Sequence, residues 1–267
     1  DREEYLADPD YVDVPIEGLL SKDYARTRAQ SIDLKRASSV ITPGNPWLHS
    51  AEVFKNNPPR LKVSPEKEDT TYFCVVDKWG NAVSQLQSLQ MPFGSSIVAG
   101  DTGILLNNRM TYWHLDEDHV DRLHPGKRVR HTMNPVMVFE SNNHKNKNLK
   151  IICGTPGADT QVQTNFQILS HILDFGMTVT EAVEAPRWRH MQNSTESTYP
   201  HDCKNELWIE GRYPSQVQEL LKEFNHAVRM IGPWDAVGSE MIIEINSDEG
   251  VFLGAADPRR DGYAIGW

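Results

Sequence analysis

The sequence has 267 residues, of which 39% are apolar and 9% aromatic, so it can bury a core in one large domain or two small ones and is not a wholly disordered chain. Its 27 Lys and Arg residues against 37 Asp and Glu residues give a formal charge of −10, which argues against nucleic acid as a partner. No apolar run approaches the roughly 18 residues that a membrane-spanning helix needs, so we expect no membrane partner either.

The cysteines and the first residues bear on the cellular compartment. Cys74, Cys153 and Cys203 are odd in number, and the first two lie in apolar stretches where a thiol usually behaves as a small buried hydrophobe. This usage favours a reducing compartment such as the cytoplasm. The chain begins DREEYLADPDYVDV, without an initiator Met or the apolar core of a signal peptide, so we expect a fragment or a processed chain whose localisation cannot be assigned.

The first part of the chain predicts one helix, a connector and a hairpin. Residues 20–38 are typical of a surface helix that Ser21 caps, and residues 41–69 form a polar connector rich in proline. From residue 70, two β-runs (70–76 and 82–89) flank the turn sequence DKWGN. If Asp77 pairs with Asn81, Thr70 lies opposite Ser88 to within one residue.

The rest of the chain predicts strands on both sides of a helical region. We expect strands at residues 135–139 and 149–153, then a helix over residues 160–176 that Asp159 or Thr160 caps and Gly176 ends. Its expected apolar face consists of Val162, Phe166, Leu169, Ile172 and Leu173. Further helices are expected from Thr180 to before Pro186 and over 215–224, and strands over 206–210, 227–231, 240–245 and 250–256. The pattern predicts an α+β fold in which antiparallel sheets are layered with helices.

Most polar motifs have an ordinary structural interpretation. The sequence has no HExxH motif, paired CxxC or EF-hand loop, and we expect its loop histidines (His114, His119, His124 and His131) to be solvated. The basic run at residues 127–130 is likewise expected to be solvated surface. The loop GTPGAD (154–159) lacks the ending of a phosphate-binding P-loop, but its backbone N–H groups before a helix would suit an oxyanion hole.

Thr70 has two interpretations. It is an ordinary first residue of a strand unless the chain is cut between Asp69 and Thr70. Such a cut would free an α-amino group, with a reference pKa of about 7.7–8.0, next to the Thr70 hydroxyl. The amine could then act as the base that activates that hydroxyl as a nucleophile.

Several segments together resemble the γ-glutamyltranspeptidase family, whose members are N-terminal-nucleophile hydrolases that cut themselves to expose a catalytic Thr. The start of the family's small subunit is similar to DTTYFCVVDKWGNAVSQLQSLQMPFGSSIVAGDTGILLNN (69–108). The resemblance continues through GTPGADTQVQ, DFGMTVTEAVEAPRWRH and GAADPRRDGYAIGW, and DPDYVDVPIEGLLSKDYA resembles the end of the large subunit. It implies the four-layer αββα fold, here partial because the N-terminal half of the family fold is absent.

The resemblance also divides the chain and assigns catalytic roles. Residues 1–69 match the C-terminal part of the large subunit with its processing linker, and residues 70–267 match the small catalytic subunit, with cleavage between Asp69 and Thr70. Thr70 matches the nucleophile, and Ser88 matches a hydroxyl residue that bonds to it. Gly157 and Ala158 match a Gly-Gly pair whose backbone N–H groups form the oxyanion hole. An Ala there would be strained if its φ has to be positive.

The substrate-binding positions depart from the family pattern. Gln90 replaces an Asn, Arg109 replaces a Gln, and Tyr112 stands where transpeptidases carry an Asp for the substrate α-ammonium. His131 and Thr132 replace a Ser-Ser pair that helps to hold the α-carboxylate. These exchanges remove a negative charge and add a positive one, so we expect amide substrates whose acyl group bears a carboxylate but no free ammonium, of glutaryl or oxamate type.

The leading hypothesis is therefore an amide hydrolase or acyltransferase that works through an acyl-enzyme and needs no cofactor or metal. Its expected partners are a small-molecule amide and the missing N-terminal half, and a homo-oligomer stays open. One alternative is a true γ-glutamyltransferase and glutathione hydrolase. The other is an unprocessed, non-catalytic homologue with a binding or structural role.

Overall fold

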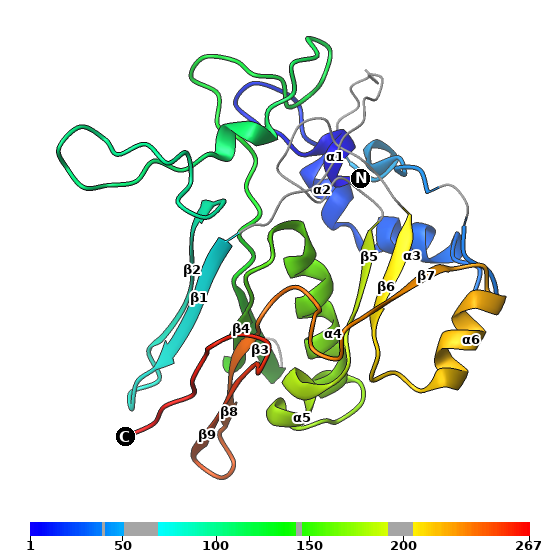
Figure 1. Cartoon of the computed structure of the whole chain (residues 1–267), viewed down its shortest axis with the longest axis vertical. Coiled ribbons are helices and arrows are strands. Elements are labelled where there is room, and N and C mark those ends of the chain that lie inside the picture. The colour runs from blue at the N-terminus through cyan, green and yellow to red at the C-terminus, as the bar shows by residue number, and fades with distance from the viewer. Residues whose placement is uncertain (39–40, 51–68, 143–145, 192–204) are drawn as a thin grey trace.

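The structure is a computed structural model that describes residues 1–38, 41–50, 69–142, 146–191 and 205–267 (Figure 1). The chain begins with three short helices, α1 (Arg2–Tyr5), α2 (Ile16–Leu20) and α3 (Lys22–Gln30), and a 3₁₀ turn at Pro46–His49. As expected, the Ser21 side chain caps α3 by accepting hydrogen bonds from the backbone N–H groups of Asp23 and Tyr24. The helix ends at Gln30, before the expected residue 38. Most of the predicted connector, residues 51–68, lies outside the described residues.

The predicted hairpin is present with the predicted register. Strand β1 (Asp69–Val76) pairs antiparallel with β2 (Ala82–Gln90), and Thr70 lies opposite Ser88. The Asp77 N–H donates to the Asn81 carbonyl over 3.0 Å, so the turn closes at the pair from which the register was derived. The pairing is irregular between Asp69 and Thr70.

A four-stranded antiparallel sheet forms the centre of the molecule. Its strands β3 (Val136–Asn142), β4 (Asn146–Gly154), β8 (Met241–Asn246) and β9 (Val251–Ala256) lie in the order β3-β4-β8-β9. Helices α4 (Gln161–Leu173) and α5 (Val179–Glu184) cover one face, in a core that includes Ile151, Cys153, Ile168 and Val183. The hairpin lies on the other face, where the ring of Tyr72 fills the space beside Gly154. The order of layers is therefore helix, sheet and hairpin.

A separate three-stranded sheet lies beside these layers (Figure 1). It contains β5 (Trp188–Met191), β6 (Glu206–Glu210) and β7 (Ala227–Ile231), in the order β5-β6-β7. Strands β6 and β7 are parallel because α6 (Ser215–Glu223) connects them, so the expectation of antiparallel sheets alone was wrong. Strand β5 was not predicted. It has four residues and no alternating pattern.

Helix α4 packs only part of its expected face against the protein. Ile172 is buried and Leu169 packs against the core, but Val162, Phe166 and Leu173 are 54%, 62% and 49% exposed. Polar side chains of the helix are buried instead because they bind neighbouring backbone: the side-chain amide of Gln167 both donates to and accepts from Trp188. Helix α6 has no buried residue, and its Val217 and Leu220 are 37% and 46% exposed.

The ends of α4 were predicted in part. Thr160 is at the N-cap position, but its hydroxyl donates to the Gly157 carbonyl and does not cap the helix. Past the other end, Gly176 has a φ of +69° and its N–H donates to the Ile172 carbonyl, which closes the helix as expected.

Both cysteines within the described residues are partly or fully buried, as expected. Cys74 and Cys153 are free thiols and burial raises the pKa of both, that of Cys74 to about 11. Cys203 lies outside the described residues.

The basic run at residues 127–130 is not solvated surface: Lys127 and Arg130 are buried, and Lys127 donates to the Val120 carbonyl. Within the described residues, no helix has the length and hydropathy to cross a bilayer.

Candidate active site

Thr70 lies at the start of β1, on the face that packs against the central sheet. Only 6% of the residue is exposed. Strand alternation places Thr70 and Tyr72 on the same face, and Tyr72 contacts Gly154, where β4 ends and the loop 154–159 begins. Figure 1 shows that β1 begins at the end of the molecule at which β4 ends. The candidate nucleophile and the candidate oxyanion loop are therefore at the same end of the two layers.

Ser88 accepts hydrogen bonds from three different groups. The Thr70 hydroxyl donates to its Oγ over 2.9 Å, the Arg109 guanidinium over 2.7 Å and the Gln90 backbone N–H over 2.9 Å. The guanidinium gives a positive environment to the oxygen that accepts the Thr70 hydrogen bond. This arrangement orients the Thr70 hydroxyl and favours negative charge close to it.

Arg109 extends this network to two further predicted substrate-binding residues. Its guanidinium donates to the Tyr112 hydroxyl over 3.3 Å and to the Thr132 hydroxyl over 3.2 Å, and Arg109, Tyr112 and Thr132 are all buried. Two cations also lie close to the Tyr112 ring, with the Arg109 guanidinium carbon 5.5 Å and the Arg130 guanidinium carbon 5.2 Å from its centroid. The structure thus joins Thr70, Ser88, Arg109, Tyr112 and Thr132 by hydrogen bonds.

Gln90 and His131 are at the margin of this network. The Gln90 side chain is buried and donates to the Thr111 hydroxyl over 3.0 Å, so Gln90 reaches Ser88 by its backbone alone. Its φ of +81° is unusual for a residue with a side chain. Partial burial and the nearby charge of Arg109 lower the pKa of His131 to about 4. His131 is therefore neutral at physiological pH, and its Nδ1 accepts the Met133 N–H.

The loop after β4 has the backbone that an oxyanion hole would use. Gly157 has a φ of +127° and Ala158 a φ of +46°, so the expected strain at the Ala is present. The loop turns directly into the 3₁₀ turn Ala158–Thr160 and then α4, which places its N–H groups at the positive end of the helix. The Thr160 N–H donates to the Gly157 carbonyl over 2.9 Å and fixes the turn.

Two neighbouring residues of α1 reach into this region. Arg2 forms an ion pair with Asp159, the residue after Ala158. Glu3 accepts from Arg130 over 2.6 Å, and its other oxygen lies 2.9 Å from Nε2 of His114. These contacts have only indirect signals in the sequence, because Arg130 lies in a basic run and Asp159 at a helix start.

His114 and His119 are not the solvated loop residues that the sequence suggested. Their rings stack at 3.4 Å between centroids, and with Glu3 they form a candidate cation site whose ligand atoms lie within 4.8 Å of one another. The geometry does not suit a metal, because parallel stacked rings cannot both direct a nitrogen at one ion. In addition, Nδ1 of His119 already accepts the Asp121 N–H, and Glu3 is paired with Arg130.

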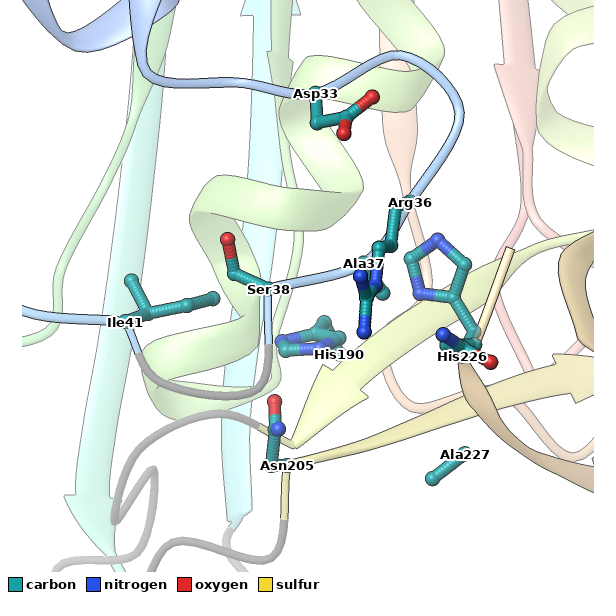
Figure 2. A pocket seen from close by; sticks show the side chains of 10 residues that line it. Asp33, Arg36, Ala37, Ser38, Ile41, His190, Asn205, His226 and Ala227 are labelled. Carbon is teal, nitrogen blue, oxygen red and sulfur yellow. The ribbon is translucent and has the colours of Figure 1, made fainter.

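A pocket of about 390 Å³ lies elsewhere, between residues 33–38 and 41 on one side and the three-stranded sheet on the other (Figure 2). His190 and His226 are part of its lining, and none of the predicted site residues is. Because none of the predicted site residues lines this pocket, the candidate active site is the Thr70 region.

Comparison with known proteins assigns the family. The gamma-glutamyltranspeptidase family matches residues 1–267. The chain belongs to the γ-glutamyltranspeptidase family. It is 37% identical over its whole length to the glutathione hydrolase-like YwrD proenzyme of Bacillus subtilis (strain 168), and 30% identical to the oxamate amidohydrolase proenzyme of Klebsiella pneumoniae, and it covers 44% of each. The chain thus spans less than half the length of these relatives.

Solved structures agree with this membership in the γ-glutamyltranspeptidase family. The whole chain superposes on 42% of the cephalosporin acylase from Bacillus halodurans with a TM-score of 0.79 and 29% identity. A further match covers 74% of this chain and 99% of a chain of the gamma-glutamyltranspeptidase from Pseudomonas nitroreducens, with a TM-score of 0.60 and 27% identity. The fold is that of the N-terminal-nucleophile hydrolases, of which this chain holds a part.

Proposed function

We propose that this chain belongs to an amide-cleaving enzyme of the γ-glutamyltranspeptidase family that cuts itself between Asp69 and Thr70. The observation that carries the proposal is the hydrogen bond of 2.9 Å between the Thr70 hydroxyl and Ser88, whose Oγ also binds the Arg109 guanidinium. The irregular pairing at Asp69 and Thr70 supports it, because the peptide bond to be cut lies at that irregularity. Residues 1–69 would then be the end of a large subunit, and residues 70–267 the small subunit.

The solved chain from Pseudomonas nitroreducens supports this division. That chain is matched almost completely by 74% of the present one, the share that residues 70–267 make up. Several curated relatives are proenzymes by name. The rest of the enzyme is a proposed partner, and it would cover the outer face of the hairpin, where Phe73, Val75 and Val83 are 40%, 48% and 46% exposed.

The proposed reaction has two steps. The Thr70 Oγ attacks the amide carbonyl while the free α-amine of Thr70 takes the hydroxyl proton, and the backbone N–H groups of Gly157 and Ala158 stabilise the oxyanion. The C–N bond then breaks, and the proton goes to the departing amine. Water, or an acceptor amine, next attacks the ester, releases the acyl group and restores the Thr70 hydroxyl.

For the substrate, we propose amides of carboxylate-bearing acyl groups that lack a free α-ammonium. Tyr112 is fully buried with the guanidinium groups of Arg109 and Arg130 close to its ring, so an ammonium group there would lie near two cations. An uncompensated buried charge costs several kcal/mol, which is a preference of orders of magnitude in kcat/KM. An oxamate amidohydrolase and an acylase, by name, are among the relatives, and oxamate is an amide whose acyl group bears a carboxylate and no ammonium.

A true γ-glutamyltransferase is the second candidate, because several relatives are glutathione hydrolase proenzymes by name. Measuring kcat/KM for a γ-glutamyl anilide and for its des-amino glutaryl analogue, on the same complete enzyme, separates the two. We expect the glutaryl compound to be preferred. A clear preference for the γ-glutamyl compound would overturn the proposed substrate class and leave the family mechanism intact.

Substitution of Thr70 tests the mechanism itself. Thr70→Ala should be inactive and uncut, whereas Thr70→Ser should keep partial activity because it retains a hydroxyl and an amine. Thr180→Ala is the matched control, since Thr180 is an exposed residue of the same type in α5, away from the hairpin. Full activity of Thr70→Ala would reject the proposed nucleophile and favour the alternative of an unprocessed homologue.

A further inference from the structure

The oxyanion loop is held in a strained conformation that needs support from both sides. The positive φ of Ala158 is strained for a residue with a side chain. Such conformations persist only where the surrounding structure fixes them. On one side, the Thr160 hydroxyl and N–H both donate to the Gly157 carbonyl. The support next to Ala158 itself comes from Asp159.

Asp159 is anchored by a residue from the other end of the chain. Its side chain is 8% exposed and forms an ion pair with Arg2. Burial raises the pKa of Asp159, while the charges of Arg2 and Arg130 oppose that rise and stabilise the carboxylate. Removing Arg2 would leave a buried charge without its partner, which is far more costly than losing an exposed ion pair.

Glu3, the residue next to Arg2, supports the part of the site around Tyr112. Glu3 binds Arg130 over 2.6 Å, and the Arg130 guanidinium lies over the ring of Tyr112. Arg130 immediately precedes His131 and Thr132 in the chain, and its own side chain is 3% exposed. Figure 1 shows α1 beside the long loop that leads into β3, which is the loop that carries these residues.

We propose that Arg2 and Glu3 are positioning residues. Arg2 holds the oxyanion loop, and Glu3 holds Arg130 against Tyr112, in the arrangement that catalysis needs. This inference rests on the proposed function at Thr70. Both residues precede the cleavage point and both of their partners follow it. After cleavage, α1 therefore stays bound and acts on the small subunit from outside it.

The test is a set of variants in the complete, processed enzyme, with kcat and KM measured separately. Arg2→Ala should lower kcat at least tenfold and change KM less than threefold, because misplacing an oxyanion donor weakens binding of the transition state more than that of the substrate. Arg2→Lys should recover most of the activity. Arg26→Ala is the control, since Arg26 forms an exposed ion pair with Asp23 and should keep the kcat of the unmodified enzyme.

A charge-reversed pair keeps the test decisive if Arg2→Ala does not fold. Arg2→Asp combined with Asp159→Arg should be more active than either single change, because the pair is restored in the opposite sense. Unchanged kcat in Arg2→Ala, or a double variant no better than the singles, would overturn the proposal. Thr70→Ala distinguishes this failure from failure of the proposed function. If Thr70→Ala is inactive while Arg2→Ala is normal, only the positioning role is wrong.

Discussion

At the scale of single residues, Ser88 is the centre of the site. Its oxygen accepts from a hydroxyl, a backbone N–H and a guanidinium, so its acceptor capacity is fully used. The Thr70 hydroxyl therefore has one defined direction. The sequence predicted this pair because hairpin register follows from turn geometry, whereas the link to Arg109 depends on a loop that has no periodic pattern.

Ser88→Ala should slow both self-cleavage and turnover. The change removes the acceptor of the Thr70 hydroxyl and a partner of Arg109, and hydrogen bonds to charged groups contribute roughly 1.5–3 kcal/mol. We expect a loss of about tenfold or more in kcat and incomplete processing on denaturing gels, with activity restored by Ser88→Thr. Ser215→Ala, an exposed change in α6, is the control. Normal processing and turnover in Ser88→Ala would contradict the assignment.

Ala158→Gly should be tolerated. Glycine removes roughly 1–2 kcal/mol of left-handed strain but gains about 0.4–1 kcal/mol of unfolded-state entropy, so the net change in the free energy of unfolding should be small and favourable. Thermal denaturation and kcat should both stay close to those of the unmodified protein. Ala158→Val adds a β-branched side chain at the same φ and should lower both. Equal behaviour of the two variants would show that the conformation at 158 is unimportant.

Tyr112→Asp should shift the preference toward γ-glutamyl substrates. The new carboxylate would lie beside Arg109 and Arg130 and offset positive charge where a substrate ammonium would bind. The measurement is the ratio of kcat/KM values for the γ-glutamyl and glutaryl compounds. Tyr112→Phe, which keeps the ring and loses only the hydroxyl contact, should leave that ratio nearly unchanged. The same ratio in both variants would remove Tyr112 from the specificity determinants.

At the scale of elements, a buried carboxyl lies where β8 begins next to the end of β4. Glu240 has no exposed surface, and its burial raises its pKa from 4.5 to about 7, against the opposing charge of Arg187. Cys153 and Gly154 are its neighbours, so this group lies beneath the start of the oxyanion loop. Its titration is therefore coupled to the stability of the central sheet.

The free energy of unfolding should consequently fall as pH rises through about 7. Between pH 4.5 and about 7, the folded protein keeps a proton on Glu240 that the unfolded chain has released. Glu240→Gln should abolish this dependence. Its gain in the free energy of unfolding over the unmodified protein should therefore be greater at pH 8 than at pH 5, by on the order of 3 kcal/mol. Thermal denaturation at the two pH values measures it, with Glu249→Gln, an exposed change, as the control. The same pH dependence in Glu240→Gln would show that another group is responsible.

At the same scale, the helices and strands themselves were easier to predict from the sequence than the neighbours against which they pack or pair. The hairpin, the central strands and the extent of α4 follow from local periodicity and turn residues. The buried face of α4 did not, because Gln167 and Asn165 are buried by hydrogen bonds to Trp188 and Asn134 that no hydrophobic pattern encodes. The parallel pairing of β6 and β7 likewise depends on how α6 crosses between them.

At the scale of the whole molecule, the chain is held together across the proposed cleavage point by ion pairs. Arg2 pairs with Asp159, Glu3 with Arg130, and Asp8 with Arg128. Long-range pairs of this kind are invisible to spacing arguments, which explains why Lys127–Arg130 was expected to be surface. These contacts let the two parts of the proposed enzyme stay associated after the peptide bond is cut.

The most direct test of the central claim is the N-terminal sequence of the small piece of the active, complete protein. We predict a new N-terminus that begins Thr-Thr-Tyr-Phe at Thr70, and no such piece from Thr70→Ala. An active enzyme that remains one uncut chain, or that begins at another residue, would contradict the account.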